Sequence, residues 1–163
     1  VHVFIYSAAV FNNYQASEEE RTQFGLGTIL HDIGKSVIPK MVLYKRGKLN
    51  TEEQVLFRLH PQKGVGICSQ VSLRQVAINT ILFHHEKGDG SGYPAGLKTS
   101  GIPIHAKIAA IADSYDSLTL GRPHAEPISP SRSMAVIQND YNGLHDPEIL
   151  LLFEKVLTEA GIL

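Results

Sequence analysis

The sequence predicts an all-α protein, a bundle of helices around one hydrophobic core. Apolar residues recur at helical spacing in most segments, and almost no segment shows the alternating pattern of a strand. A length of 163 residues and a hydrophobic content of 43% suit a single domain that folds without disulfide support. Histidines gather in compact motifs beside Asp, Glu, Pro or another His, which indicates a chemical site inside the bundle.

The strongest helical pattern is the segment 104–118, where apolar residues recur in steps of four and three. Gly34 is a stop signal after an earlier helix. Thr51 is the expected cap of a helix that runs to His60, and Pro61 forces a kink or a restart there. Together the apolar spacings predict helices over 1–11, 18–33, 52–60, 61–70, 73–84, 104–118, 131–141 and 147–160.

The segments between these helices carry turn-forming residues. A connector is expected from Lys35 to Asn50. A Gly-rich loop is expected from Gly88 to Gly101, without regular structure and able to bring the backbone close to a ligand. Residues 121–130 form a further loop before the two closing helices.

Charge and cysteine usage exclude several classes of protein. Lys and Arg number 15 against 16 Asp and Glu, so no basic field exists to hold a long nucleic acid. Cys68 is the single cysteine and is expected to pack in a cytoplasmic protein. No apolar run reaches the roughly 18 residues of a membrane span. Because the chain begins inside a helix, we expect a fragment of a longer protein whose N-terminal regulatory region is missing.

The candidate chemical residues sit at helix ends or inside the strongest helix. They are His31, Asp32, His60, His84, His85 and Asp113. Taken singly, each histidine is better explained as a core or helix-end histidine, and the carboxylates as surface groups. Taken together, imidazole and carboxylate ligands on several helices suit a dinuclear site for Fe, Mn or a related metal rather than a Cys-rich zinc site.

Four motifs occur in order along the chain: HDIGK at 31–35, HPQKG at 60–64, HHEKGDGSGYP at 84–94 and IADSYDSLT at 111–119. In this combination the chain resembles the HD-GYP family, a branch of the HD-domain phosphohydrolases. The resemblance implies one HD-GYP domain over 1–163, an all-helical HD-domain bundle with a buried di-metal centre. It also implies an enzyme that hydrolyses the bacterial messenger cyclic di-GMP to pGpG or GMP.

The resemblance assigns roles to residues of this chain. The implied ligands of two divalent metals are His2, His31, Asp32, His60, His84, His85 and Asp113. Asp32 would bridge the two metals, and some members bind a third through a Glu about one turn before the position of His2. Lys35 would stabilise charge on the scissile phosphate, which makes Lys35 and Asp32 the implied catalytic residues. The implied substrate-binding residues are Gly92, Tyr93, Pro94 and Arg122.

Three departures from the family pattern concern substrate binding. The segment 122–126 reads RPHAE where the family usually adds a further basic residue, Gly88 replaces an aromatic residue, and His145 replaces Phe. Two alternatives therefore stay open beside the enzyme. One is a weakly active or inactive module that binds cyclic di-GMP or a signalling protein partner, and the other is a phosphohydrolase for another nucleotide. A homodimer is left open as well.

Overall fold

The computed structural model describes residues 1–121, 126–139 and 143–163. Within these ranges every regular element is helical, and an isolated bridge between Asp89 and Lys98 is the only strand-like pairing. The predicted all-α class is confirmed. The elements are α1 (His2–Phe11), α2 (Glu18–Leu30), η1 (Ile33–Val37), α3 (Lys40–Leu43), α4 (Thr51–Arg58), α5 (His60–Ile67), η2 (Cys68–Gln70), α6 (Gln75–Phe83), η3 (Thr99–Gly101), α7 (Ile104–Leu120), α8 (Pro130–Asn139) and α9 (Pro147–Glu159).

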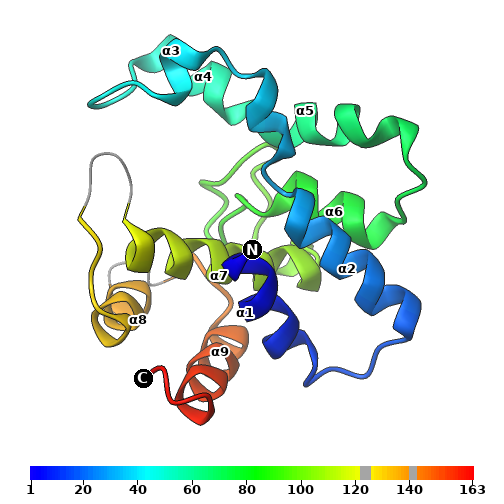
Figure 1. The fold of residues 1–163 in the computed structure, drawn as a ribbon, viewed down its shortest axis with the longest axis vertical. Helices are drawn as coiled ribbons and strands as arrows, with labels where there is room; N and C mark the ends of the chain where they lie inside the picture. The colour runs from blue at the N-terminus through cyan, green and yellow to red at the C-terminus, as the bar shows by residue number, and fades with distance from the viewer. Residues whose placement is uncertain (122–125, 140–142) are drawn as a thin grey trace.

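Helix α7 crosses the middle of the fold (Figure 1). It packs against α1, α6, α8 and α9, while α2 packs on α1 and α6. Helix α5 lies on α6 and on the short 3-10 helix η1. The pair α3 and α4 extends away from this bundle at one end of the molecule (Figure 1). The ends of α2, α5 and α6 therefore meet beside α7.

The core is built on the apolar face of α7. Ile108, Ile111 and Tyr115 are fully buried, as their spacing predicts. Phe24 of α2 and Phe153 of α9 belong to the same buried cluster. Burying a large apolar side chain stabilises a fold by roughly 1.5–3 kcal/mol, so this cluster fixes α7 in place between its neighbours.

The prediction for the second helix was wrong in its end and in its buried face. Helix α2 ends at Leu30 instead of residue 33, and although Phe24 is buried, the apolar Ile29 is 60% exposed. The buried face contains Gly27 instead, where a Cβ would lie only 2.7 Å from the Cβ of Thr80 on α6. Close contact between the two helices therefore selects a small residue, which apolar spacing cannot reveal.

The predicted connector 35–50 contains helical structure that the sequence did not indicate. The last residues of η1 and all of α3 lie in it. Ile38 and Val42 are buried in this segment, with exposed fractions of 6% and 4%. Such short helices are stable only through tertiary packing, which explains why no periodicity signals them.

The cap of α4 lies one residue earlier than predicted. The side chain of Asn50, not that of Thr51, accepts the N–H of Glu53 at 2.9 Å, and the Glu53 carboxylate accepts the N–H of Asn50 at 2.8 Å. Helix α4 ends two residues before His60, and α5 restarts with Pro61 in its first turn, so the predicted restart is confirmed.

Helices α8 and α9 occupy the two closing segments that were predicted, and the described part of α8 ends at Asn139. Cys68 is buried, as expected for a packing residue. None of the helices in the described ranges combines the length and the apolar character needed to cross a membrane.

Candidate metal centre

Six of the seven ligands proposed from the sequence gather where α2, α5, α6 and α7 meet. They form two groups, Asp32 with His60, His84 and His85, and Asp32 with His31 and Asp113. In each group the ligand atoms lie within 4.8 Å of one another, and Asp32 belongs to both. Helix ends supply all of these residues except Asp113, which lies within α7.

Three of the histidines share one hydrogen-bond pattern. The Nδ1 atoms of His31, His60 and His84 lie 2.7, 2.9 and 2.9 Å from the carbonyl oxygen three residues earlier in the chain. A carbonyl oxygen only accepts, so Nδ1 carries the proton and donates it. In the neutral ring Nε2 then keeps its lone pair, which is the form in which imidazole binds a metal.

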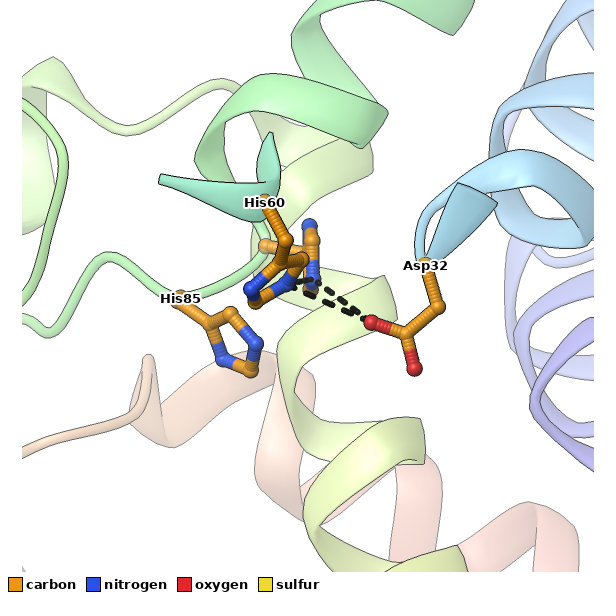
Figure 2. Close-up of side chains that lie close together, drawn as sticks. Asp32, His60 and His85 are labelled. Atoms are coloured by element: carbon orange, nitrogen blue, oxygen red, sulfur yellow. Dashed lines mark hydrogen bonds and ion pairs between the residues drawn. The ribbon is translucent and has the colours of Figure 1, made fainter. Parts of the chain in front are cut away.

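The free nitrogens face Asp32, which approaches the centre from a different side than His85 (Figure 2). Asp32 Oδ1 lies 3.3 Å from His60 Nε2 and 3.8 Å from His84 Nε2. Asp32 Oδ2 lies 3.4 Å from His31 Nε2. Each carboxylate oxygen thus faces a different set of imidazoles, which suits a residue that bridges two cations.

Several buried atoms of the centre have no hydrogen-bond partner in the described part of the chain. They include His31 Nε2, Asp32 Oδ1 and His85 Nε2. Leaving such an atom unpaired costs roughly 1–3 kcal/mol. Asp113 adds a second carboxylate, 3.8 Å from His31 Nε2. Converging, unpaired imidazole and carboxylate atoms fit divalent metal ions, which would satisfy all of them.

The protonation states of Asp32, Asp113, His84 and His85 agree with this use, whereas His31 must lose a proton before it binds a metal. Burial raises the pKa of Asp32, but the three imidazoles that face it outweigh burial and hold the pKa far below its usual range. The pKa of Asp113 is also lowered, because His31 outweighs burial there. Burial lowers the pKa of His84 and of His85, which keeps both rings neutral. Burial acts the same way on His31, yet the two carboxylates raise its pKa to about 10.

Gly34 brings the two sides of the centre together. A Cβ at this position would overlap the carbonyl oxygen of His60 and lie 2.6 Å from the backbone N of Gly64. Helix α2 ends at Leu30, four residues before Gly34, so its predicted role as the stop signal was wrong. The glycine is required instead because η1 and α5 touch backbone to backbone, which holds His60 against Asp32.

Lys35 lies beside the centre on η1. Its Nζ donates a hydrogen bond to Asp32 Oδ2 at 2.6 Å and lies 5.6 Å from the ring centroid of Phe57. The ammonium is therefore held at the edge of the ligand cluster, where it can bind an anion.

The GYP segment packs directly on a ligand. The ring of Tyr93 stacks on that of His85, with centroids 4.8 Å apart and an interplanar angle of 30°. The peptide bond between Tyr93 and Pro94 is cis. A Cβ at Gly92 would overlap the backbone N of Lys87 and lie 2.6 Å from the carbonyl oxygen of His85. Only glycine allows this loop to lie so close to the ligand pair.

Glu86 holds this loop, a role that the sequence analysis missed. It is 3% exposed, and its carboxylate accepts the N–H groups of Ala95, Gly96 and Leu97 at 2.6, 3.1 and 2.8 Å. The sequence feature that could have indicated this role is a Glu directly after the His84–His85 pair, because a carboxylate buried beside them needs several hydrogen-bond donors. Glu86 is thus a positioning residue for the segment that carries Tyr93.

Two of the departures from the family pattern meet in space. The N–H of Gly88 donates to the carbonyl oxygen of Leu144 at 2.7 Å, and a Cβ at Gly88 would lie 2.8 Å from Gly143 O. The next residue, His145, has its Nε2 3.4 Å from Ser114 Oγ. The missing side chain at position 88 therefore makes room for the backbone that carries His145.

One other proposed ligand, His2, belongs to neither ligand group. His2 Nδ1 lies 3.2 Å from Asp116 Oδ1, and neither residue belongs to the two ligand groups. The role of His2 as a ligand stays a prediction. The sequence analysis did not name Asp116 as a partner of His2, although this residue follows Asp113 by three positions and so lies on the same side of α7. Arg122 falls outside the described residues.

A cleft of about 750 Å³ opens on the centre. Its wall includes Asp32, Lys35, His85, Tyr93 and Asp113. The volume is that of a small-molecule site. Gly92 and Pro94 do not line it, so they act through the position of Tyr93 in this structure.

Fold and site together define a class of protein: an all-helical bundle that holds divalent metal in a His and Asp cluster at the meeting point of several helices. The family model described as "HD domain" matches residues 6–149. The chain belongs to the HD-domain family, and its motifs and relatives place it in the HD-GYP branch.

Individual relatives agree with this assignment. The chain is 38% identical over 136 residues to a cyclic di-GMP phosphodiesterase of Pseudomonas aeruginosa, covering 82% of this chain and 32% of that protein. It is 39% identical over 127 residues to the 3′3′-cGAMP-specific phosphodiesterase 2 of Vibrio cholerae, covering 77% and 24%. This chain thus spans about a third or less of the length of these curated relatives.

A solved structure shares the fold. The HDG"Y"P protein Bd1817 of Bdellovibrio bacteriovorus superposes with a TM-score of 0.77 at 22% identity, over 97% of this chain and 51% of that one. At this identity the likeness concerns the arrangement of helices.

Proposed function

We propose that this chain is a metal-dependent phosphodiesterase domain that hydrolyses cyclic di-GMP to pGpG or GMP. The observation that carries the proposal is the pair of ligand groups joined by Asp32 at a cleft of small-molecule size. The name of the Pseudomonas aeruginosa relative supports the substrate.

The proposed cofactor is a pair of divalent ions, Fe or Mn, because these metals accept mixed imidazole and carboxylate ligands. Asp32 with His60, His84 and His85 would hold one ion, and Asp32 with His31 and Asp113 the other. Bound metals would supply Lewis-acid activation of water and of the phosphodiester. A third ion and a contribution from His2 remain predictions.

The protein's own groups have separate tasks in this proposal. The Lys35 ammonium stabilises negative charge on the scissile phosphate. Tyr93 lines the cleft and offers a ring for stacking on a base and a hydroxyl for a phosphate. Gly92 and Pro94 place that ring. Arg122 remains the predicted nucleotide contact, and a cytoplasmic location, a signalling partner and a homodimer remain predictions too.

The decisive experiment compares metal content and product formation in anaerobically prepared protein. We expect His31→Ala to lose metal, because it removes a ligand. Lys35→Ala should keep its metal and lose about a hundredfold in rate, the scale of one electrostatic contact to a transition state. Lys40→Ala, an exposed lysine on α3, is the matched control and should behave as wild type. Turnover retained in both His31→Ala and Lys35→Ala would refute the site.

A second cyclic dinucleotide deserves the same test. The Vibrio cholerae relative is named for 3′3′-cGAMP and is as similar to this chain as the cyclic di-GMP enzyme is. A panel of cyclic di-GMP, 3′3′-cGAMP and mononucleotides would therefore be compared by kcat/KM. Preference for another nucleotide would replace the proposed substrate. Binding without product in metal-loaded protein would indicate a signalling module instead of an enzyme.

A further inference from the structure

The cleft must neutralise more than one phosphate if the proposed function holds, and this inference rests on that function. A cyclic dinucleotide carries two phosphates in one ring, and only one of them is cleaved at a time. The second phosphate enters the cleft with its negative charge and requires its own cation or hydrogen-bond donors.

Three lysines line the cleft within the described residues: Lys35, Lys45 and Lys87. Lys35 is bound to Asp32, at the metal centre. Lys45 is bound to the carboxylate of Glu53 on α4. Among the described residues the Lys87 ammonium interacts electrostatically with Asp89 and His145 but makes no hydrogen bond or ion pair, so it is available to a ligand.

The backbone of Lys87 is fixed on both sides. Glu86 before it is buried and bound to three backbone N–H groups of the following loop. Gly88 after it donates its N–H to Leu144 O at 2.7 Å. A long side chain on a fixed backbone loses less freedom on binding than one on a loose loop, so its contribution to affinity is larger.

Lys87 and Lys35 reach the cleft from different segments of the chain. Lys35 follows Asp32 by three residues, and Lys87 follows His85 by two. Lys35 belongs to η1, whereas Lys87 lies in the segment that follows α6. Lys87 additionally lines a smaller hollow together with Ser114 and His145, so a hydroxyl and an imidazole lie beside it.

We propose that Lys87, with the Ser114 hydroxyl beside it, binds the phosphate of the cyclic dinucleotide that is not being cleaved. The scissile phosphate lies at the metal centre with Lys35, and the ring of the substrate spans the two lysines. Lys87 is thus a substrate-binding residue that favours ligands with two phosphates over those with one.

The test compares Lys87→Met with the wild type on two substrates, cyclic di-GMP and bis(4-nitrophenyl) phosphate, which has a single phosphodiester. Methionine keeps most of the apolar stem and removes the charge. Loss of one charged contact to phosphate should raise KM for cyclic di-GMP about tenfold. The ratio of kcat/KM values for the two substrates should fall by the same factor. Lys98→Met, an exposed lysine of the same segment outside the cleft, is the matched control.

Calorimetry of cyclic di-GMP binding to metal-loaded protein separates this inference from the proposed function. A Kd raised about tenfold in Lys87→Met supports the inference even if wild type forms no product, an outcome that would refute only the proposed hydrolysis. A Kd and KM equal to wild type would overturn the role of Lys87, as would an equal loss on both substrates. Absence of binding by wild type would overturn both proposals.

Discussion

Replacing Gly34 by alanine tests whether the contact between η1 and α5 sets the geometry of the metal centre. The new Cβ would overlap the carbonyl oxygen of His60. The backbone N of Gly64, 2.6 Å away, would have to retreat by about 0.8 Å to reach 3.4 Å, where ordinary contact begins. His60 moves with α5, while Asp32 stays with η1, whose N-cap it is. The 3.3 Å approach of His60 Nε2 to Asp32 Oδ1 would change by a similar amount.

Such a movement exceeds what a metal site tolerates, because ligand distances vary by only about 0.2 Å. We therefore expect Gly34→Ala to lose most of its metal. Overpacking should also cost about 1–3 kcal/mol in the free energy of unfolding, which lowers Tm by several degrees at roughly 2–4 °C per kcal/mol. Metal content after gel filtration and thermal unfolding measure the two effects.

Gly66→Ala is the control for this substitution, because it lies in the same helix α5 and its Cβ would meet nothing within 4 Å. Alanine there should keep the metal and raise stability by up to about 1 kcal/mol, the difference in helix propensity. Wild-type metal content and Tm in Gly34→Ala would refute the reasoning, since the two backbones would then not need to touch.

Three further predictions concern hydrogen bonds and protons. Glu86→Gln replaces a carboxylate that accepts three N–H groups by an amide with one acceptor oxygen. We expect the KM for cyclic di-GMP to rise about tenfold while the metal content is kept. An unchanged KM would show that the loop does not depend on these hydrogen bonds. Burial raises the pKa of Asp146, but the Lys107 ammonium at 2.9 Å outweighs it and lowers the pKa. Its contribution is therefore fully present above the unfolded pKa of about 4 and is lost as pH falls through the lowered folded pKa. Asp146→Asn keeps the cap of α9 and should cost about 1 kcal/mol in urea unfolding at pH 7 and less at pH 3, whereas an equal cost at both values would exclude the ion pair as its source. Because His31 has a pKa of about 10 without metal, binding must release its proton. Apparent metal affinity should rise by up to about tenfold per unit between pH 6 and 8, and a flat profile in a metal titration would contradict that protonation state.

The sequence by itself determined the class of the fold and the membership of the site. Helical spacing is a local property, so the apolar line through Ile108, Ile111 and Tyr115 was readable before any contact was known. The ligand motifs were readable for a different reason, since imidazole and carboxylate groups clustered at helix ends have few other uses in combination. Six residues predicted on this basis lie together in the structure.

Only the tertiary structure decided how these parts meet. It gives Asp32 two oxygens that face different imidazoles, places Gly27 and Gly34 where backbones touch, and uses Glu86 to hold a loop nine to eleven residues away. It also pairs His2 with Asp116 and places the Lys87 ammonium at the wall of the cleft. These features depend on distances between segments far apart in the chain. Local spacing carries no information on such distances, because they arise from how whole helices pack.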